Sequence, residues 1–312
     1  MKIAGVTLCF NESKMVKYVM PYWERMKIDK LIVYDNMSTD NTVELLKEYP
    51  FVEVRTFDTN GKFDDGMNSK VKNETIEELK EAGYDWIYSG DFDEVIYSFN
   101  PDFREELSKI DKCGGNVFCR DLVHPFTLDS NFVFDPSKLI HEQLPHFVTW
   151  FDLSGQKNYG AKVLLHNPKN ITKLKYGHGQ HDLTFGKESK AVYFGYPFIA
   201  LHLKYVDLPV LQNNSVGKYE RISWRFNVDN MNKAQKYLHT LYAKSKDDEA
   251  MIKLVKKLSS RSEKYNTTTW KDLLNRYNTH SFIVNRTKQI DNSMVTRLDY
   301  YNIDNSIFYK SI

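Results

Sequence analysis

The sequence predicts an α/β protein in which a mixed, Rossmann-like sheet is flanked by helices and followed by a helical C-terminal extension. Three observations lead to this fold class. Strand-like and helix-like segments alternate from residue 2 to residue 89, short strand-like runs separated by turn-rich loops follow Cys113, and the pattern turns helical beyond Asp207. We therefore expect an α/β domain over residues 1–206 and a helical region over residues 207–312 that packs on it or extends from it.

The N-terminal part alternates four buried-type strands with three helices. The expected strands are residues 2–9, 31–34, 52–57 and 86–89, and the expected helices are residues 12–26, 40–48 and 68–82. Apolar side chains of the first helix recur at helical spacing from Met15 to Met26. Such alternation implies a parallel sheet with helices on both faces, and ligands of these sheets bind beyond the carboxyl ends of the strands. We expect Asn11, Asp35 and residues 91–94 to meet at that edge.

The second half of the chain carries shorter elements. We expect strands at residues 116–123, 147–151, 162–166 and 198–204, which form a mixed or antiparallel extension of the same sheet. Beyond Asp207 we expect helices at residues 215–241, 248–258 and 270–277.

Composition places the chain among globular proteins. Of its 312 residues, 41% are hydrophobic and 27% are charged, and 43 Lys and Arg against 41 Asp and Glu leave a net charge of only +2. Such a balance provides no basic field for nonspecific nucleic-acid binding, so we expect no nucleic-acid partner. Aromatic residues are abundant, at 14%, and their rings can serve as core or as platforms for flat ligands and sugar faces.

Targeting features are few. Cys9, Cys113 and Cys119 form no CxxC pair, the N-terminal apolar run ends early for a signal peptide, and no segment approaches the ~20 apolar residues of a membrane span. We expect a cytoplasmic protein. The stretch from Lys253 to Arg261 is weakly basic and could make a peripheral contact with the inner face of a membrane, whereas a plain solvated helix face is the alternative.

An acidic motif, Asp91-Phe92-Asp93-Glu94, directly follows the fourth expected strand. Asp91 and Asp93 bring two carboxylates to the edge of the sheet, where oxygen ligands can hold a hard divalent cation. Mg²⁺ or Mn²⁺ held this way keeps coordination positions open for substrate phosphates. The alternative is an acidic turn that caps the next segment.

A second polar motif runs from Asp35 to Thr42, directly after the second expected strand. Its Ser38, Thr39 and Asp40 are expected to cap the following helix. Capping leaves Asp35 unexplained, and a carboxylate at that strand end can accept a hydrogen bond from a nucleobase imide.

Together these motifs resemble the family 2-like glycosyltransferases of GT-A fold. The resemblance rests on Asn11-Glu12-Ser13 after the first strand, on the motif D-N-x-S-x-D that begins at Asp35, and on the motif D-x-D-E that begins at Asp91. It is specific over residues 1–97, weaker over residues 98–206 and absent from the C-terminal helices. The resemblance implies a GT-A-like fold for residues 1–206 and a site for a nucleoside-diphosphate sugar, most simply a UDP-sugar.

The resemblance also implies a role for each matching residue in the nucleotide site. Asp35 resembles the acid on the uracil side, and Asn11 with Glu12 resembles the loop that borders the nucleotide. Asp91 resembles the residue near the ribose and the metal, and Lys70, on the preceding helix, could face the diphosphate. For Lys70 a solvated helix charge is the alternative, and Asn73 is a second candidate on the same helix.

The same resemblance implies a metal site and a catalytic base. Asp93 resembles the direct ligand of Mn²⁺ or Mg²⁺, Asp91 is a second ligand, and His202 in the strand LHLKY resembles the late histidine that completes such a site. His178 is an alternative ligand, and a hydrogen-bonded core histidine is the alternative for His202. Asp182 is the expected catalytic base, with the alternatives Asp121, Glu142 and Asp152 left open.

The function expected from these features is metal-dependent sugar transfer. A sugar would move from a UDP-linked donor to a glycan, a lipid-linked glycan or another hydroxyl acceptor, with inversion, as in polysaccharide biosynthesis. One alternative is a sugar nucleotidyltransferase, but that class carries a Gly-rich basic loop after the first strand, and Cys9-Phe10-Asn11-Glu12-Ser13 has neither glycine nor arginine. The other is a noncatalytic carbohydrate-binding protein of the same fold, which would have no need of an acidic cluster.

Overall fold

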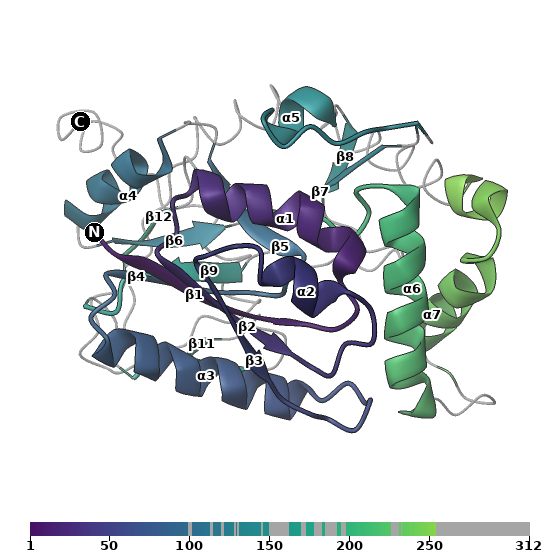
Figure 1. Ribbon diagram of the computed structural model, residues 1–312, viewed down its shortest axis with the longest axis horizontal. Helices are drawn as coiled ribbons and strands as arrows, with labels where there is room; N and C mark the ends of the chain where they lie inside the picture. The colour runs from purple at the N-terminus through teal and green to yellow at the C-terminus, as the bar shows by residue number, and fades with distance from the viewer. Residues whose placement is uncertain are drawn as a thin grey trace.

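The computed structural model describes residues 1–98, 102–112, 115–119, 122–127, 129, 131–144, 146–149, 162–169, 173–177, 183–184, 192–194, 198–225, 231 and 233–253. Within these ranges the chain forms a seven-stranded sheet, a four-stranded sheet and a two-stranded ribbon, with helices packed around them (Figure 1). The expected α/β fold class, with a mixed sheet flanked by helices, is confirmed.

The seven-stranded sheet is built around the four predicted N-terminal strands. Its order is β12-β6-β9-β4-β1-β2-β3. The strands are β1 (Ile3–Cys9), β2 (Lys30–Asp35), β3 (Val52–Thr56), β4 (Trp86–Ser89), β6 (Gly115–Cys119), β9 (Lys162–His166) and β12 (Val192–Phe194). β1 to β4 run parallel, with Cys9 opposite Asp35 and Asp35 opposite Thr56, so their carboxyl ends meet at one edge. β9 is antiparallel to β4 and to β6, which makes the sheet mixed.

Helices cover both faces of this sheet. α1 (Ser13–Arg25) and α2 (Thr42–Leu46) lie on one face and α3 (Asp65–Glu81) lies along the other, while α4 (Phe103–Lys112) packs near β6 (Figure 1). α1 buries Met15, Val19 and Tyr22, as the helical spacing predicted. α3 begins after Asp64, whose carboxylate accepts a hydrogen bond from the amide of Met67.

The second half departs from the predicted single sheet. The strand predicted at residues 116–123 is two strands, β6 and β7 (Leu122–Phe126), and they belong to different sheets. The separate sheet has the order β5-β13-β7-β8, with β5 (Glu94–Ser98), β8 (His146–Thr149) and β13 (Phe198–His202). Of the predicted extension strands, the one at residues 162–166 joins the main sheet, whereas those at 147–151 and 198–204 do not. Local alternation identifies a strand, but it leaves the partner of that strand open.

Several elements were not predicted. They are α4, α5 (Ile140–Gln143), β12 and the ribbon strands β10 (Lys175–Tyr176) and β11 (Leu183–Thr184). β5 was also missed, because it begins at Glu94, the last residue of the acidic motif, and no turn residues outside that motif signal a new strand.

The predicted helix at residues 215–241 is wrong in its bounds. α6 (Leu208–Ile222) begins at the cap residue Asp207, which accepts a 2.7 Å hydrogen bond from the amide of Val210. It ends in a 3-10 turn (Ser223–Arg225), and α7 (Lys233–Lys244) is a separate helix packed against it. Residues 248–253 are helical, as predicted, and the helix predicted at residues 270–277 lies outside the described residues. The boundary at residue 206 remains a prediction.

In the described part of the chain, no helix combines the length and the apolar character that crossing a membrane requires.

Aromatic side chains make up much of the core. Trp23 of α1 packs edge-on against Tyr88 of β4, with ring centroids 4.5 Å apart, and both are buried. Trp86, Tyr97 and Phe198 are also fully buried. A large part of the aromatic content is therefore structural.

Gly90 joins β4 to the acidic motif, and its lack of a side chain is required there. A Cβ at this position would collide with the hydroxyl and ring of Tyr88, which is buried and donates a 2.6 Å hydrogen bond to the carbonyl of Glu94. Gly90→Ala is expected to lower the free energy of unfolding by about 1–3 kcal/mol, because the core must shift to accept the methyl group. Urea denaturation measures this, with Gly217→Ala as the control because a Cβ there meets no atom within 4 Å. An unchanged stability of Gly90→Ala would contradict the placement of Tyr88.

Candidate functional site

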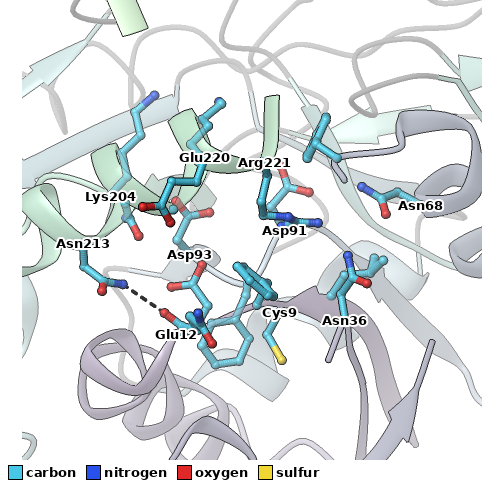
Figure 2. Close-up of a pocket in the computed structure, with 18 of the residues that line it drawn as sticks. Cys9, Glu12, Asn36, Asn68, Asp91, Asp93, Lys204, Asn213, Glu220 and Arg221 are labelled. Atoms are coloured by element: carbon cyan, nitrogen blue, oxygen red, sulfur yellow. Dashed lines mark hydrogen bonds between the residues drawn. The ribbon is translucent and has the colours of Figure 1, made fainter. Parts of the chain in front are cut away.

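A polar cavity opens at the carboxyl ends of the parallel strands. Its volume is about 310 Å³, and it is lined by residues that follow β1, β2, β3 and β4, by the end of β13 and by one side of α6 (Figure 2). Asn11, Glu12, Asp91, Asp93 and His202, all predicted as site residues, line it together. The expectation that these strand ends converge is met.

The turn between β1 and α1 forms the floor of the cavity and is held by the motif that follows β2. Asn11 adopts a left-handed backbone conformation, with φ of 53°. Its amide donates to Ser38 Oγ at 2.8 Å, and the amide of Glu12 donates to Thr42 Oγ1 at 2.8 Å. The side chain of Asn11 accepts from the amide of Thr39 at 2.8 Å, so much of its hydrogen-bonding capacity serves this turn.

The predicted capping role of this motif is therefore only part of its function. Asp40 does accept a 3.0 Å hydrogen bond from the amide of Thr42 in the first turn of α2, but the cap residue itself, Asn41, makes no side-chain cap bond. The hydroxyl oxygens of Ser38 and Thr42 instead accept hydrogen bonds from the amides of Asn11 and Glu12 in the neighbouring turn. The polar motif mainly joins two strand ends, and thereby shapes the cavity.

Asp35 lies behind the cavity rather than in its lining. Its side chain is 4% exposed, accepts a 3.0 Å hydrogen bond from the amide of Ser38 and contacts the thiol of Cys9. The neighbouring Asn36 lines the cavity, with its amide group bound to Thr59. Asp35 thus supports the strand end, and the polar group presented to the cavity at this strand is Asn36.

Lys72 of α3, which was not predicted as a site residue, binds the first acid of the D-x-D-E motif. Its side chain is 4% exposed, and its ammonium lies 2.9 Å from Asp91 Oδ1. Lys72 shares the inward face of α3 with Thr75, Ile76 and Leu79. The spacing i, i+3, i+4 and i+7 marks that face in the sequence and is the signal that could have identified Lys72.

The predicted Lys70 lies elsewhere. Its side chain is 65% exposed, is 3.9 Å from Glu74 on the same helix, and is not among the residues that line the cavity. Lys70 therefore lies where a solvated charge on a helix would lie, which is the alternative given for it above.

The pairing of β5 with β13 brings Asp93 and His202 together. His202 lies opposite Glu94 in the antiparallel register, and the amide of Leu203 donates a 2.7 Å hydrogen bond to the carbonyl of Asp93. As a result His202 Nε2 lies 2.9 Å from Asp93 Oδ2. These residues are 109 positions apart in the chain, so only the fold could join them.

Electrostatics keep Asp93 ionised despite its burial. Burial alone would raise the pKa of this carboxyl, but the charge and hydrogen bond of His202 outweigh that effect and hold the pKa below its ordinary value. Glu94, fully buried behind the pair, places Oε1 3.8 Å from His202 Nδ1 and accepts from the amide of Asp91 at 3.3 Å. A carboxylate behind the second ring nitrogen is a common way to orient a metal-binding histidine.

The donor set suits a divalent cation that is completed by its ligand. Among the described residues, no group of three or more His, Cys, Asp or Glu side chains is arranged to hold a metal ion by itself. Two adjacent ligands of an octahedral ion, each about 2.1 Å from it, lie about 3 Å apart, and the Asp93–His202 separation of 2.9 Å matches this. Mg²⁺ in particular is usually held by one or two protein ligands together with phosphates and water.

Several polar atoms of the lining residues lack partners. Within the described ranges, three such atoms are buried without a hydrogen-bond partner: Glu12 Oε2, Asn68 Oδ1 and Arg221 Nε. An unsatisfied buried polar atom costs about 1–3 kcal/mol, so a group of them in one cavity indicates a polar ligand.

Glu12 is a buried carboxyl with a strongly shifted pKa. Burial raises the pKa of its carboxyl well above the usual range, repulsion by Asp93 and Asp40 adds to this, and attraction by Arg221 opposes it. Because the folded state holds this proton more tightly than the unfolded state does, the group stabilises the fold at low pH. That contribution declines as the pH rises from the unfolded-state pKa, about 4.3, through the folded-state value.

Glu12→Gln is therefore expected to remove a decline of stability with rising pH. The variant should match the wild type near pH 4 and exceed it at pH 7–8 in the absence of ligand, because the neutral amide escapes the repulsion. Urea denaturation at a series of pH values measures this, with Glu44→Gln at an exposed position of α2 as the control. Parallel pH curves for wild type and Glu12→Gln would show that Glu12 is not buried as a carboxylate.

The remaining base candidates are placed as follows. Asp182, the expected base, and the alternatives Asp121 and Asp152 lie outside the described residues, as does the alternative ligand His178. Glu142 belongs to α5, where its carboxylate accepts a 2.8 Å hydrogen bond from the amide of Leu139, and it does not line the cavity.

Sequence reasoning also missed the aromatic and helical parts of the lining. Phe10, Phe57, Phe63 and Phe92 line the cavity, whereas Tyr97 and Tyr176 are buried in the core. α6 contributes a full wall, including Asn213, which donates a 2.9 Å hydrogen bond to the carbonyl of Asn11 (Figure 2). No local pattern in the sequence announces this approach of α6 to β1.

Comparison with known proteins adds little beyond the fold. No protein-family model matches the chain, and no curated protein matches it either. The crystal structure of 4-diphosphocytidyl-2C-methyl-D-erythritol synthase is similar with a TM-score of 0.28 and 12% identity, over 53% of this chain and 75% of that one. The structure of the synthase from Anaerococcus prevotii DSM 20548 gives a TM-score of 0.26 and 13% identity, over 54% and 72%.

A third solved structure, titled only as a mycobacterial protein, gives a TM-score of 0.29 and 15% identity, over 58% of this chain and 57% of that one. At such low scores and identities these likenesses carry no argument about what this chain does. The resemblance to family 2-like glycosyltransferases accordingly remains a prediction, and the site itself has to support any function.

Proposed function

We propose that this chain is a metal-dependent glycosyltransferase that uses a nucleoside-diphosphate sugar as donor. The observation that supports this most is the approach of His202 Nε2 to Asp93 Oδ2, at 2.9 Å, in a polar cavity at the carboxyl ends of the parallel strands. Nucleotides bind at this edge in open α/β sheets. A pair of ligands with open positions suits a cation that the donor diphosphate completes.

In this proposal Asp93 and His202 would hold Mn²⁺ or Mg²⁺. Such an ion supplies Lewis-acid stabilisation to the charge that develops on a departing diphosphate. Asp91, paired with the buried Lys72, provides a second carboxylate in the lining of the same cavity. Asn11 and Glu12 border the nucleotide from the β1–α1 turn, while Asp35 acts from behind by fixing the strand end that carries Asn36.

The acceptor side of the proposal comes from the sequence alone. Asp182 is the proposed base that takes the proton of an acceptor hydroxyl in an inverting displacement, and the acceptor is a glycan or a lipid-linked glycan. Of the described carboxylates, Glu220 on α6 also lines the cavity and is a matched comparison for Asp182 in mutagenesis.

A second candidate is nucleotidyl transfer, in which a sugar phosphate attacks a nucleoside triphosphate and releases diphosphate. Two of the similar structures are of a diphosphocytidyl synthase, but at TM-scores of 0.28 and 0.26 that likeness carries no argument for this chain. Against it, the β1–α1 turn of this chain lacks the glycine and basic residues that wrap a triphosphate, and it carries the carboxylate of Glu12.

One screen separates the two candidates. The purified chain is incubated with Mn²⁺ and, in one arm, with UDP-, GDP- or dTDP-sugars, where release of the nucleoside diphosphate is followed. In the other arm it receives CTP, UTP or GTP with sugar phosphates, where release of inorganic diphosphate is followed. We expect turnover, including slow donor hydrolysis, in the first arm. Turnover in the second arm alone would overturn the proposal in favour of nucleotidyl transfer.

A further inference from the structure

Arg221 of α6 faces the acidic strand ends from the opposite wall of the cavity. It lies in the part of the chain where the resemblance to glycosyltransferases is absent, yet its side chain lines the cavity beside Asp91 (Figure 2). The carbonyl of Arg221 accepts hydrogen bonds from the amide of Phe63, at 3.2 Å, and from the indole of Trp224, at 3.0 Å. The end of α6 is thus tied to the loop before α3, which fixes where the guanidinium is presented.

Two aromatic rings hold the guanidinium in place. Its carbon lies 4.5 Å from the ring centroid of Phe10 and 5.7 Å from that of Phe63. Stacking of this kind orders the planar group while leaving its edges, where the N–H donors lie, open to a partner.

One N–H donor of Arg221 lacks a partner among the described residues. Its Nε is buried without a hydrogen bond, and among the described residues no carboxylate forms an ion pair with it. Glu12, the nearby acid, attracts Arg221 electrostatically, but its Oε2 is also buried without a hydrogen-bond partner. A half-buried guanidinium that is stacked on two rings, with an unpartnered buried N–H, is arranged for an anion from outside.

We infer that Arg221 binds a phosphate group of the ligand, so that α6 and the Asp93–His202 pair hold a diphosphate from two sides. The inference rests on the proposed function and deepens it, because it selects a ligand with two phosphates over one with a single phosphate. Arginine suits this role through its fork of N–H donors, which matches phosphate oxygens. Through Arg221, α6 would contribute a ligand-binding residue and would be part of the site.

Titration calorimetry with Mn²⁺ present tests the inference on wild type, Arg221→Ala and Arg221→Lys. The probes are UDP, uridine and inorganic pyrophosphate. Loss of a charged hydrogen bond is expected to weaken binding of UDP and of pyrophosphate by about 10- to 100-fold in Arg221→Ala. The affinity for uridine should stay unchanged. Arg221→Lys should lose a smaller factor, because lysine keeps the charge but not the planar fork.

Lys236→Ala, which removes one exposed positive charge from α7, is the control for net charge and should bind all probes like the wild type. Arg221→Lys also covers the case in which Arg221→Ala fails to fold without its stacking contacts. UDP and pyrophosphate affinities that match the wild type, or an equal loss for uridine, would overturn the inference and leave the proposed function intact. If the wild type binds neither UDP nor pyrophosphate, the proposed function fails as well.

Discussion

Asp93→Ala is expected to lower kcat/KM for sugar transfer by a factor of about 100 or more, with little loss of folding stability. Asp93 would hold the cation that offsets charge on the leaving diphosphate, and such stabilisation contributes several kcal/mol to the transition state. His202 would lose its 2.9 Å contact with Asp93, but the backbone hydrogen bond from the amide of Leu203 to the carbonyl of residue 93 does not depend on that side chain, so the fold should persist. Steady-state kinetics with the donor identified by the screen, together with a thermal melt, measure both effects.

Two further variants sharpen this test. His202→Ala should also lose activity, by a smaller factor than Asp93→Ala, because one charged ligand remains. Glu105→Gln, on α4 and remote from the cavity, should behave like the wild type. Activity of Asp93→Ala within a factor of a few of the wild type would contradict a role for Asp93 in metal binding.

Asp91→Ala is expected to destabilise the fold, by about 1–3 kcal/mol, as well as to impair the site. Removing this carboxylate takes away the group that Lys72 binds at 2.9 Å, while Lys72 itself stays 4% exposed. A buried charge that loses one of its partners is costly, but Asp91 is 52% exposed, so water reduces the loss below the value for a fully buried pair.

A double variant tests whether the contributions of Lys72 and Asp91 to folding stability depend on each other. Asp91→Ala combined with Lys72→Met removes both charges and should recover much of the stability, since a methionine fills the same space without an ammonium. Chemical denaturation gives the free energy of unfolding of the wild type, both single variants and the double variant. The four values together give the coupling free energy between the two residues. Additive losses in the double variant would show that Lys72 and Asp91 do not depend on each other.

The N-terminal strands and the position of the site were predictable from local patterns. Apolar runs alternate with amphipathic helices in the first half, and each run ends in a polar residue, at Asn11, Asp35 or Asp91. Because the carboxyl ends of parallel strands share an edge, that order alone brings these residues toward one cavity. The structure confirms the four strands and the convergence of Asn11, Asp91 and Asp93.

What sequence could not predict depends on contacts between distant segments. The approach of His202 to Asp93 follows from the β5–β13 register, and the wall built by α6 follows from how that helix packs on the β1–α1 turn. The use of Ser38 and Thr42 as acceptors for the amides of residues 11 and 12 is equally nonlocal, although capping was the simplest local expectation. Local patterns of three to eight residues predict helices and strands, but they do not predict which distant segments will contact each other.

A metal-bound diphosphate site at Asp93 is tested by the affinity of UDP with and without Mn²⁺, for the wild type and for Asp93→Ala. Mn²⁺ is expected to strengthen UDP binding to the wild type at least about tenfold and to have little effect on Asp93→Ala, because the ion would be shared between the diphosphate and Asp93. Equal and metal-independent affinities in both proteins would contradict such a site.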